Sequence, residues 1–107
     1  MKKLNEKGVT AVFCMSDAIA AGAYQYLFEI GCMPGKDISI MGFDNQEIAS
    51  LLTPEVTTMA LPLEEIGHDA VAKLIELIED PGKRVGMEQT DIRIPSVLIE
   101  RNSVAAV

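Results

Sequence analysis

The stretch that decides the fold is VTAVFCMSD, residues 9–17. Its first six residues are almost entirely apolar and rich in β-formers, which is typical of a parallel strand covered on both faces. Ser16 and Asp17 follow, and either side chain can accept a hydrogen bond from the free N–H groups that open a helix. The stretch therefore predicts a strand over residues 9–14 that runs directly into a helix.

The same alternation of short apolar runs and helical segments continues along the chain. We predict strands over residues 38–42 and 56–61 and helices over residues 18–30, 46–52 and 63–79. Residues 1–7 have the composition of a helix end, and Pro95 divides residues 92–101 into two short edge segments. We expect residues 83–91 to form a loop and residues 103–107 to fray. This order is typical of an α/β fold with a mostly parallel sheet.

Two of the predicted helices differ in the distribution of their apolar residues. Residues 63–79 carry one apolar stripe, whereas residues 18–30 are apolar nearly all round, with only Gln25 and Glu29 clearly polar. A helix of the second kind needs two covers, either from a central place in the fold or from another subunit. Because a chain of 107 residues has few helices to supply the second cover, we favour a subunit interface.

Composition excludes several classes of protein. Apolar residues make up 49% of the chain, too many for a disordered protein, and the net charge of −7 argues against a nucleic-acid surface. No apolar run reaches the roughly 18 residues of a membrane span, and no leader peptide is evident, so we expect a cytoplasmic protein without membrane contact. Cys14 and Cys32 have no metal-ligand spacing and are predicted to be buried free thiols.

Signatures of catalysis are missing from the sequence. His68 is the single histidine, and it falls on the polar side of the helix predicted over residues 63–79. No G-x-S-x-G elbow, no glycine-rich phosphate loop and no cluster with metal-ligand spacing occurs. We therefore predict no catalytic residues, no metal and no cofactor, and we rate a small hydrolase as the weakest of the hypotheses.

Polar side chains follow two predicted parallel strands at the point where each strand ends, which is where open α/β sheets bind ligands. Ser16 and Asp17 follow the first strand, and Asp44 follows the second within Gly42-Phe43-Asp44-Asn45. For Asp17 a helix cap is at least as good an interpretation as ligand contact. For Asp44 the alternative is a turn residue, and we favour ligand contact. Phe43 is predicted to lie in the core.

With these segments in place, the sequence resembles the sensor domain of the lactose/galactose-repressor family of bacterial transcription regulators. Four stretches carry the resemblance in the family's order: AVFCMSDAIAAGA (11–23), DISIMGFDN (37–45), TPEVTTMALPLEEIGHDAVAKLIELI (53–78) and IPSVLIERNSV (94–104). The resemblance implies part of a three-layer fold like that of periplasmic binding proteins. It also implies that residues 1–55 and 85–107 match the C-terminal lobe, and that residues 56–80 cross into the N-terminal lobe.

The resemblance further assigns roles to residues. Asp44 matches a frequent effector-binding aspartate, and Ser16 and Asp17 match a pair of which the first member is usually Asn and often contacts effector. Family members sense sugars or purines and bind DNA through a helix-turn-helix domain that this chain is expected to lack. Residues on the two segments that match the family's dimer surface are Ala20, Ala21, Tyr24, Leu27, Phe28, Ile48, Leu51 and Leu52.

The leading hypothesis is an effector-binding and dimerisation fragment of such a regulator. The alternatives are a stand-alone interaction module that dimerises through residues 18–30, and a fragment of a sugar-binding protein. An isolated fragment would expose apolar surface and unpaired strand edges, so we expect a homodimer or a strand-swapped oligomer.

Overall fold

The computed structural model describes residues 1–84 and 92–106. Contacts within the chain divide it into two compact units. Unit 1 comprises Met1–Ala60 and Val97–Val107, and unit 2 comprises Leu61–Ser96. The loop predicted over residues 83–91 falls almost wholly outside the described residues.

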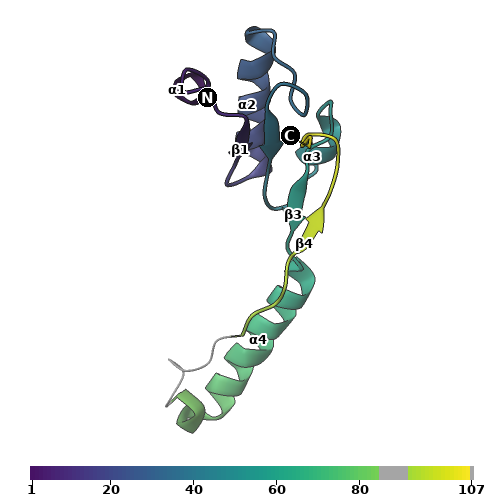
Figure 1. The fold of residues 1–107 in the computed structure, drawn as a ribbon. Helices are drawn as coiled ribbons and strands as arrows, with labels where there is room; N and C mark the ends of the chain where they lie inside the picture. The colour runs from purple at the N-terminus through teal and green to yellow at the C-terminus, as the bar shows by residue number, and fades with distance from the viewer. Residues whose placement is uncertain (85–91, 107) are drawn as a thin grey trace. The chain divides into compact units, whose positions relative to one another are not determined.

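Unit 1 is built on the strand–helix alternation that the sequence predicts (Figure 1). Strands β1 (Ala11–Phe13) and β2 (Ser39–Met41) pair in parallel, with Val12 opposite Ile40. Helix α2 (Asp17–Glu29) connects them and packs against β2 and against the short helix α3 (Ile48–Leu51). A further short helix, α1 (Lys2–Asn5), precedes β1 as expected.

The second pair of strands in unit 1 runs in opposite directions. Strand β3 (Thr58–Ala60) pairs antiparallel with β4 (Val97–Ile99). Isolated parallel bridges join Met41 to Thr57 and Asp44 to Ala60, so the backbone that leaves β2 runs alongside the β3 segment. The sheet contacts are thus mostly parallel, as predicted, with β4 antiparallel at the end. Only the segment after Pro95 becomes a strand.

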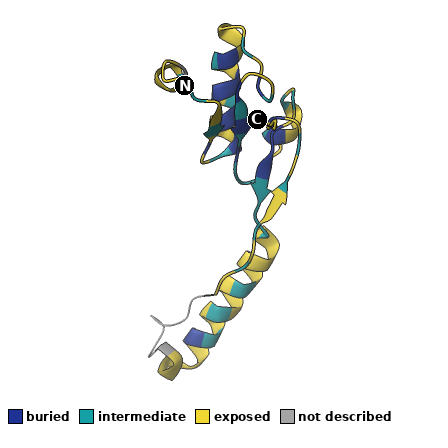
Figure 2. Ribbon diagram, viewed as in Figure 1, coloured by how far each residue is buried: buried dark blue, intermediate teal, exposed yellow. Residues whose placement is uncertain are grey.

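The core of unit 1 lies on one face of the β1–β2 pair (Figure 2). Its largest fully buried apolar side chains are Tyr24, Leu27, Ile40 and Val56. On the opposite face, Phe13 is 60% exposed, although its ring meets that of Phe43 edge-on at 6.3 Å. One face of the sheet is therefore covered and the other is open, which fits a partial domain of a layered fold.

Helix α2 obtains its second cover from its own chain. Ala20, Tyr24 and Leu27, three of the residues predicted at a subunit interface, are at most 1% exposed, and Tyr24 donates a hydrogen bond of 2.8 Å to the Pro54 carbonyl. Because α3 and the segment after it pack on α2, these three residues lie in the core of unit 1 and the interface prediction is wrong for them. The surface left for a partner is smaller than the sequence suggested.

The segment after β4 is held firmly, so the prediction that residues 103–107 fray is wrong at its start. Ser103 is fully buried, and its hydroxyl accepts a hydrogen bond from the Thr57 N–H (2.8 Å) and donates one to the Ile40 carbonyl (2.5 Å). The Ile40 N–H in turn donates to the Ser103 carbonyl. Long-range pairing with β2 supplies partners that no local pattern reveals.

Unit 2 contains α4 (Leu63–Glu79), which has the predicted bounds, and the 3-10 turn η1 (Pro81–Arg84). Leu77 is the only buried residue of α4. The predicted apolar stripe is therefore largely open to solvent, and Leu74 and Ile78 are 57% and 61% exposed. Two acidic residues, Glu64 and Glu65, lie in its first turn, where they complement the helix dipole.

Candidate functional site

The candidate site lies where the chain leaves β1 and β2, at one edge of the parallel pair. The two segments stay paired beyond the strands, because the Cys14 N–H donates to the Met41 carbonyl and the Asp17 N–H donates to the Phe43 carbonyl. Ser16, Asp17 and Asp44 are thus brought to the same edge, as the sequence predicts.

Ser16 acts as the N-cap of α2. Its backbone is extended and its hydroxyl accepts a hydrogen bond from the Ile19 N–H at 3.2 Å. The half-buried side chain keeps its own hydroxyl proton for a second partner. Ligand contact by Ser16 therefore stays a prediction, beside a capping role that the structure assigns directly.

Asp17 is fully buried, and both of its carboxylate oxygens are occupied by the chain itself. One oxygen accepts from the Thr58 hydroxyl at 2.6 Å and the other from the Gln46 N–H at 2.7 Å. Gly42 permits this close approach, because a Cβ at that position would overlap the Asp17 carboxylate. Asp17 has no surface left for a small molecule, so its prediction as a ligand-contacting residue is wrong.

Asp44 differs from Asp17 in both its exposure and its hydrogen bonding. It is half-buried, its N–H donates to the Met59 carbonyl at 3.0 Å, and its carboxylate accepts no hydrogen bond from any residue that the structure describes. Its φ of 93° lies in the region that side chains rarely adopt, and the following Asn45 has a φ of 53°. A free carboxylate on a backbone of this kind fits ligand contact better than the local turn bonding that was the alternative.

Arg101 reaches the same loop from the far end of the sequence. Its guanidinium donates to the Asn45 side-chain oxygen at 3.0 Å and to the Val56 carbonyl at 2.8 Å, and it lies 3.7 Å from the Glu55 carboxylate. Sequence reasoning missed both Arg101 and Thr58. Thr58 lies within the predicted strand over residues 56–61 and Arg101 at the end of the segment 92–101, and neither position reveals a partner more than 40 residues away.

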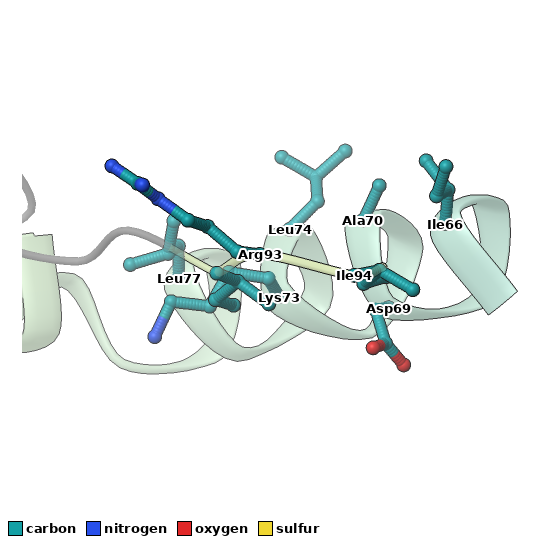
Figure 3. Close-up of a pocket in the computed structure, with 9 residues that line it drawn as sticks. Ile66, Asp69, Ala70, Lys73, Leu74, Leu77, Arg93 and Ile94 are labelled. Carbon is teal, nitrogen blue, oxygen red and sulfur yellow. The ribbon is translucent and has the colours of Figure 1, made fainter. Parts of the chain in front are cut away.

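A separate apolar groove lies in unit 2, along α4 and residues 92–94 (Figure 3). Its volume is about 810 Å³, and Asp69, Lys73 and Arg93 are the charged residues among its lining. None of the predicted ligand residues belongs to it. The groove is formed by the exposed apolar stripe of α4 and by the adjacent segment 92–94.

Other chemistry is sparse in the part of the chain that the structure describes. There, no three histidine, cysteine or acidic side chains come together as metal ligands. His68 is exposed on α4 beside Asp69, and both cysteines are free. Nor is any described helix both long and apolar enough to cross a membrane.

The amino-acid sequence of the chain matches a known protein family over nearly its whole length. The family model described as a periplasmic binding protein-like domain matches residues 2–104, and the chain belongs to this family. The proteins that it resembles include operon repressors and LacI family regulators, and the match covers only a part of each.

Individual relatives make the likeness specific. The ribose operon repressor of Haemophilus influenzae is 45% identical over 74 residues, which are 69% of this chain and 22% of the repressor. The purine repressor PurR of Pectobacterium carotovorum is 38% identical over 96 residues, 90% of this chain and 27% of PurR. The chain thus spans about a quarter of the length of these relatives.

Solved structures agree with the sequence matches. A LacI family transcriptional regulator from Enterococcus faecium with bound ribose has a TM-score of 0.81 and 30% identity, covering 99% of this chain and 38% of that one. The lac repressor dimer bound to operator and the anti-inducer ONPF has a TM-score of 0.79 and 29% identity, covering 98% and 35%.

Proposed function

We propose that this chain is the effector-contacting part of a LacI-type sensor and that Asp44 receives the hydroxyl groups of a sugar. The observation that carries the proposal is the Asp44 carboxylate, which is free of hydrogen bonds from the described residues and stands at the carboxyl edge of two parallel strands. An ionised carboxylate accepts two O–H donors, and the vicinal hydroxyls of a sugar supply such a pair.

Ribose is the effector that we favour. A relative named for the ribose operon and a neighbour with bound ribose support this choice. A purine is the second candidate, supported by the likeness to PurR. The affinity of this chain for ribose should be weak, with a dissociation constant of about millimolar, because the chain supplies only some of the polar groups that orient a ligand.

Nuclear magnetic resonance titration of the 107-residue chain tests this proposal. We expect millimolar ribose to shift the amide signals of Asn45 and Gln46, and adenine to leave them unchanged. Asp44→Asn should abolish the shifts, whereas Glu47→Gln, which neutralises an exposed carboxylate nearby, should retain them. Shifts that survive Asp44→Asn, or submicromolar affinity, would contradict the proposal.

The same proposal covers the organisation of the parent regulator. Residues 1–55 and 85–107 would belong to one lobe and residues 56–80 would cross to the other, with operator DNA bound through a separate helix-turn-helix domain. Such a regulator works in the cytoplasm and catalyses no reaction. The relatives' names as repressors support this assignment.

We propose a homodimer for the chain, over a surface narrower than the one predicted from sequence. Its remaining members are Ala21, Phe28, Ile48, Leu51 and Leu52, of which Leu51 is 71% exposed. Leu51→Glu should lower the mass in sedimentation equilibrium from dimer to monomer. Val104→Glu, at another exposed apolar residue of unit 1, should leave the dimer intact. A dimer that survives Leu51→Glu would contradict this surface and favour strand exchange.

A further inference from the structure

The loop that carries Asp44 is anchored on both sides by one buried residue. Residues 43–46 follow β2; the Asp44 N–H bonds to the Met59 carbonyl and the Asn45 side chain to Arg101, and three further hydrogen bonds hold their backbone, two to Asp17 itself and one to its partner Thr58. We propose that Asp17 is a positioning residue for the effector site: it sets the backbone that presents Asp44 and does not touch the effector. This inference rests on the function proposed above.

Two of the three anchors are direct and short. The Asp17 N–H donates to the Phe43 carbonyl at 2.9 Å, and the Asp17 carboxylate accepts from the Gln46 N–H at 2.7 Å. These two bonds fix the backbone immediately before Asp44 and two residues after it. A displacement of Asp17 would therefore loosen both ends of the loop, while the bonds of Asp44 to Met59 and of Asn45 to Arg101 remain.

Thr58 supplies the third anchor through its hydroxyl. The hydroxyl donates to the Asp17 carboxylate at 2.6 Å and is free to accept from the Asn45 N–H at 3.3 Å. Because a hydroxyl donates its single proton once, the Asp17 carboxylate orients the acceptor lone pairs of Thr58 toward Asn45. Asp17 thereby acts on the residue next to Asp44 through Thr58.

The loop needs these anchors because its backbone is strained. Asp44 and Asn45 have φ values of 93° and 53°, in regions that non-glycine residues rarely adopt. Such a backbone persists only where surrounding contacts fix it. Asp17 and Thr58 are both fully buried, so water does not compete for the bonds that supply this constraint.

Variants of Thr58 separate positioning from simple loss of stability. Thr58→Val keeps the shape of the side chain and removes the hydroxyl, whereas Thr58→Ser keeps the hydroxyl. Asp17→Asn keeps the shape and removes the charge. Folded and unfolded molecules give separate magnetic resonance signals, so the ribose dissociation constant is read from the folded molecules alone, together with hydrogen exchange at the amides of Asn45 and Gln46.

We expect Asp17→Asn and Thr58→Val to weaken ribose binding of the folded molecules about tenfold and to speed exchange at these two amides. Thr58→Ser should resemble the wild type in both measurements. If Thr58→Val lowers only the folded fraction, with unchanged affinity and exchange, the positioning role is overturned. If the wild type does not bind ribose, the proposed function fails, and the exchange data alone decide whether Asp17 holds the loop.

Discussion

Replacing Ser103 by alanine should destabilise the chain strongly, although Ser103 lies only four residues from its end. The buried hydroxyl joins the Thr57 N–H to the Ile40 carbonyl, at 2.8 and 2.5 Å. Alanine leaves the buried N–H without a partner, which costs about 1–3 kcal/mol of stability. It also removes a hydrogen bond from the carbonyl, which costs about 1 kcal/mol. The expected loss of about 2–4 kcal/mol is a large part of the about 5–15 kcal/mol that stabilises a typical domain.

Urea unfolding followed by circular dichroism measures this loss. The midpoint should fall by about 1–2 M urea with an unchanged slope. Ser50→Ala is the matched control, because the exposed Ser50 hydroxyl bonds to the carbonyl of Glu47, the N-cap of α3, and its loss should change stability by less than about 0.5 kcal/mol. Equal midpoints for the two variants would refute the role assigned to the C-terminal segment.

Three further predictions concern buried groups of unit 1. Burial raises the pKa of the Tyr24 hydroxyl from 10.0 to about 12, so the folded state holds this proton more tightly than the unfolded state. Stability should therefore be lost as pH rises from 10 to about 12, and less so in Tyr24→Phe, as followed by urea unfolding monitored by circular dichroism. Burial raises the pKa of the Cys14 thiol; the N-terminal ammonium opposes this in part, and the nearby Asp17 carboxylate adds the smallest effect, which also raises it. A thiol reagent should thus label half-buried Cys32 quickly and Cys14 only on unfolding; equal rates would contradict the buried placement. Gly42→Ala should cost about 1–3 kcal/mol in urea unfolding because its Cβ meets the Asp17 carboxylate, and a neutral result would refute that close approach.

Local signals in the sequence predicted the elements well. The spacing of apolar residues predicted α4 with its observed bounds, Leu63–Glu79. The apolar runs predicted the ends of β1 and β2 to within two residues. Helix α2 begins one residue before the predicted start. These features depend on neighbours in the chain, which the sequence displays directly.

Contacts between distant residues could not be predicted in the same way. Thr58 lies 41 positions from Asp17 and Ile40 lies 63 positions from Ser103, so the sequence leaves Asp17 open to ligand contact and predicts that Ser103 frays. Ala20, Tyr24 and Leu27 were assigned to an interface because the cover that α3 provides is not visible from α2 alone. Each error comes from tertiary pairing rather than from local pattern.

We propose that this chain carries the loop through which a LacI-type regulator senses ribose, and a chimeric repressor can test this claim. The most direct measurement replaces the matching stretch of the Haemophilus influenzae ribose operon repressor, 45% identical, with this chain and follows operator binding as ribose is added. We predict that ribose changes the operator affinity of the chimera and that Asp44→Asn removes the response while leaving ribose-free operator binding intact. Operator binding that is unaffected by ribose in the chimera, at concentrations to which the parent repressor responds, would contradict the claim.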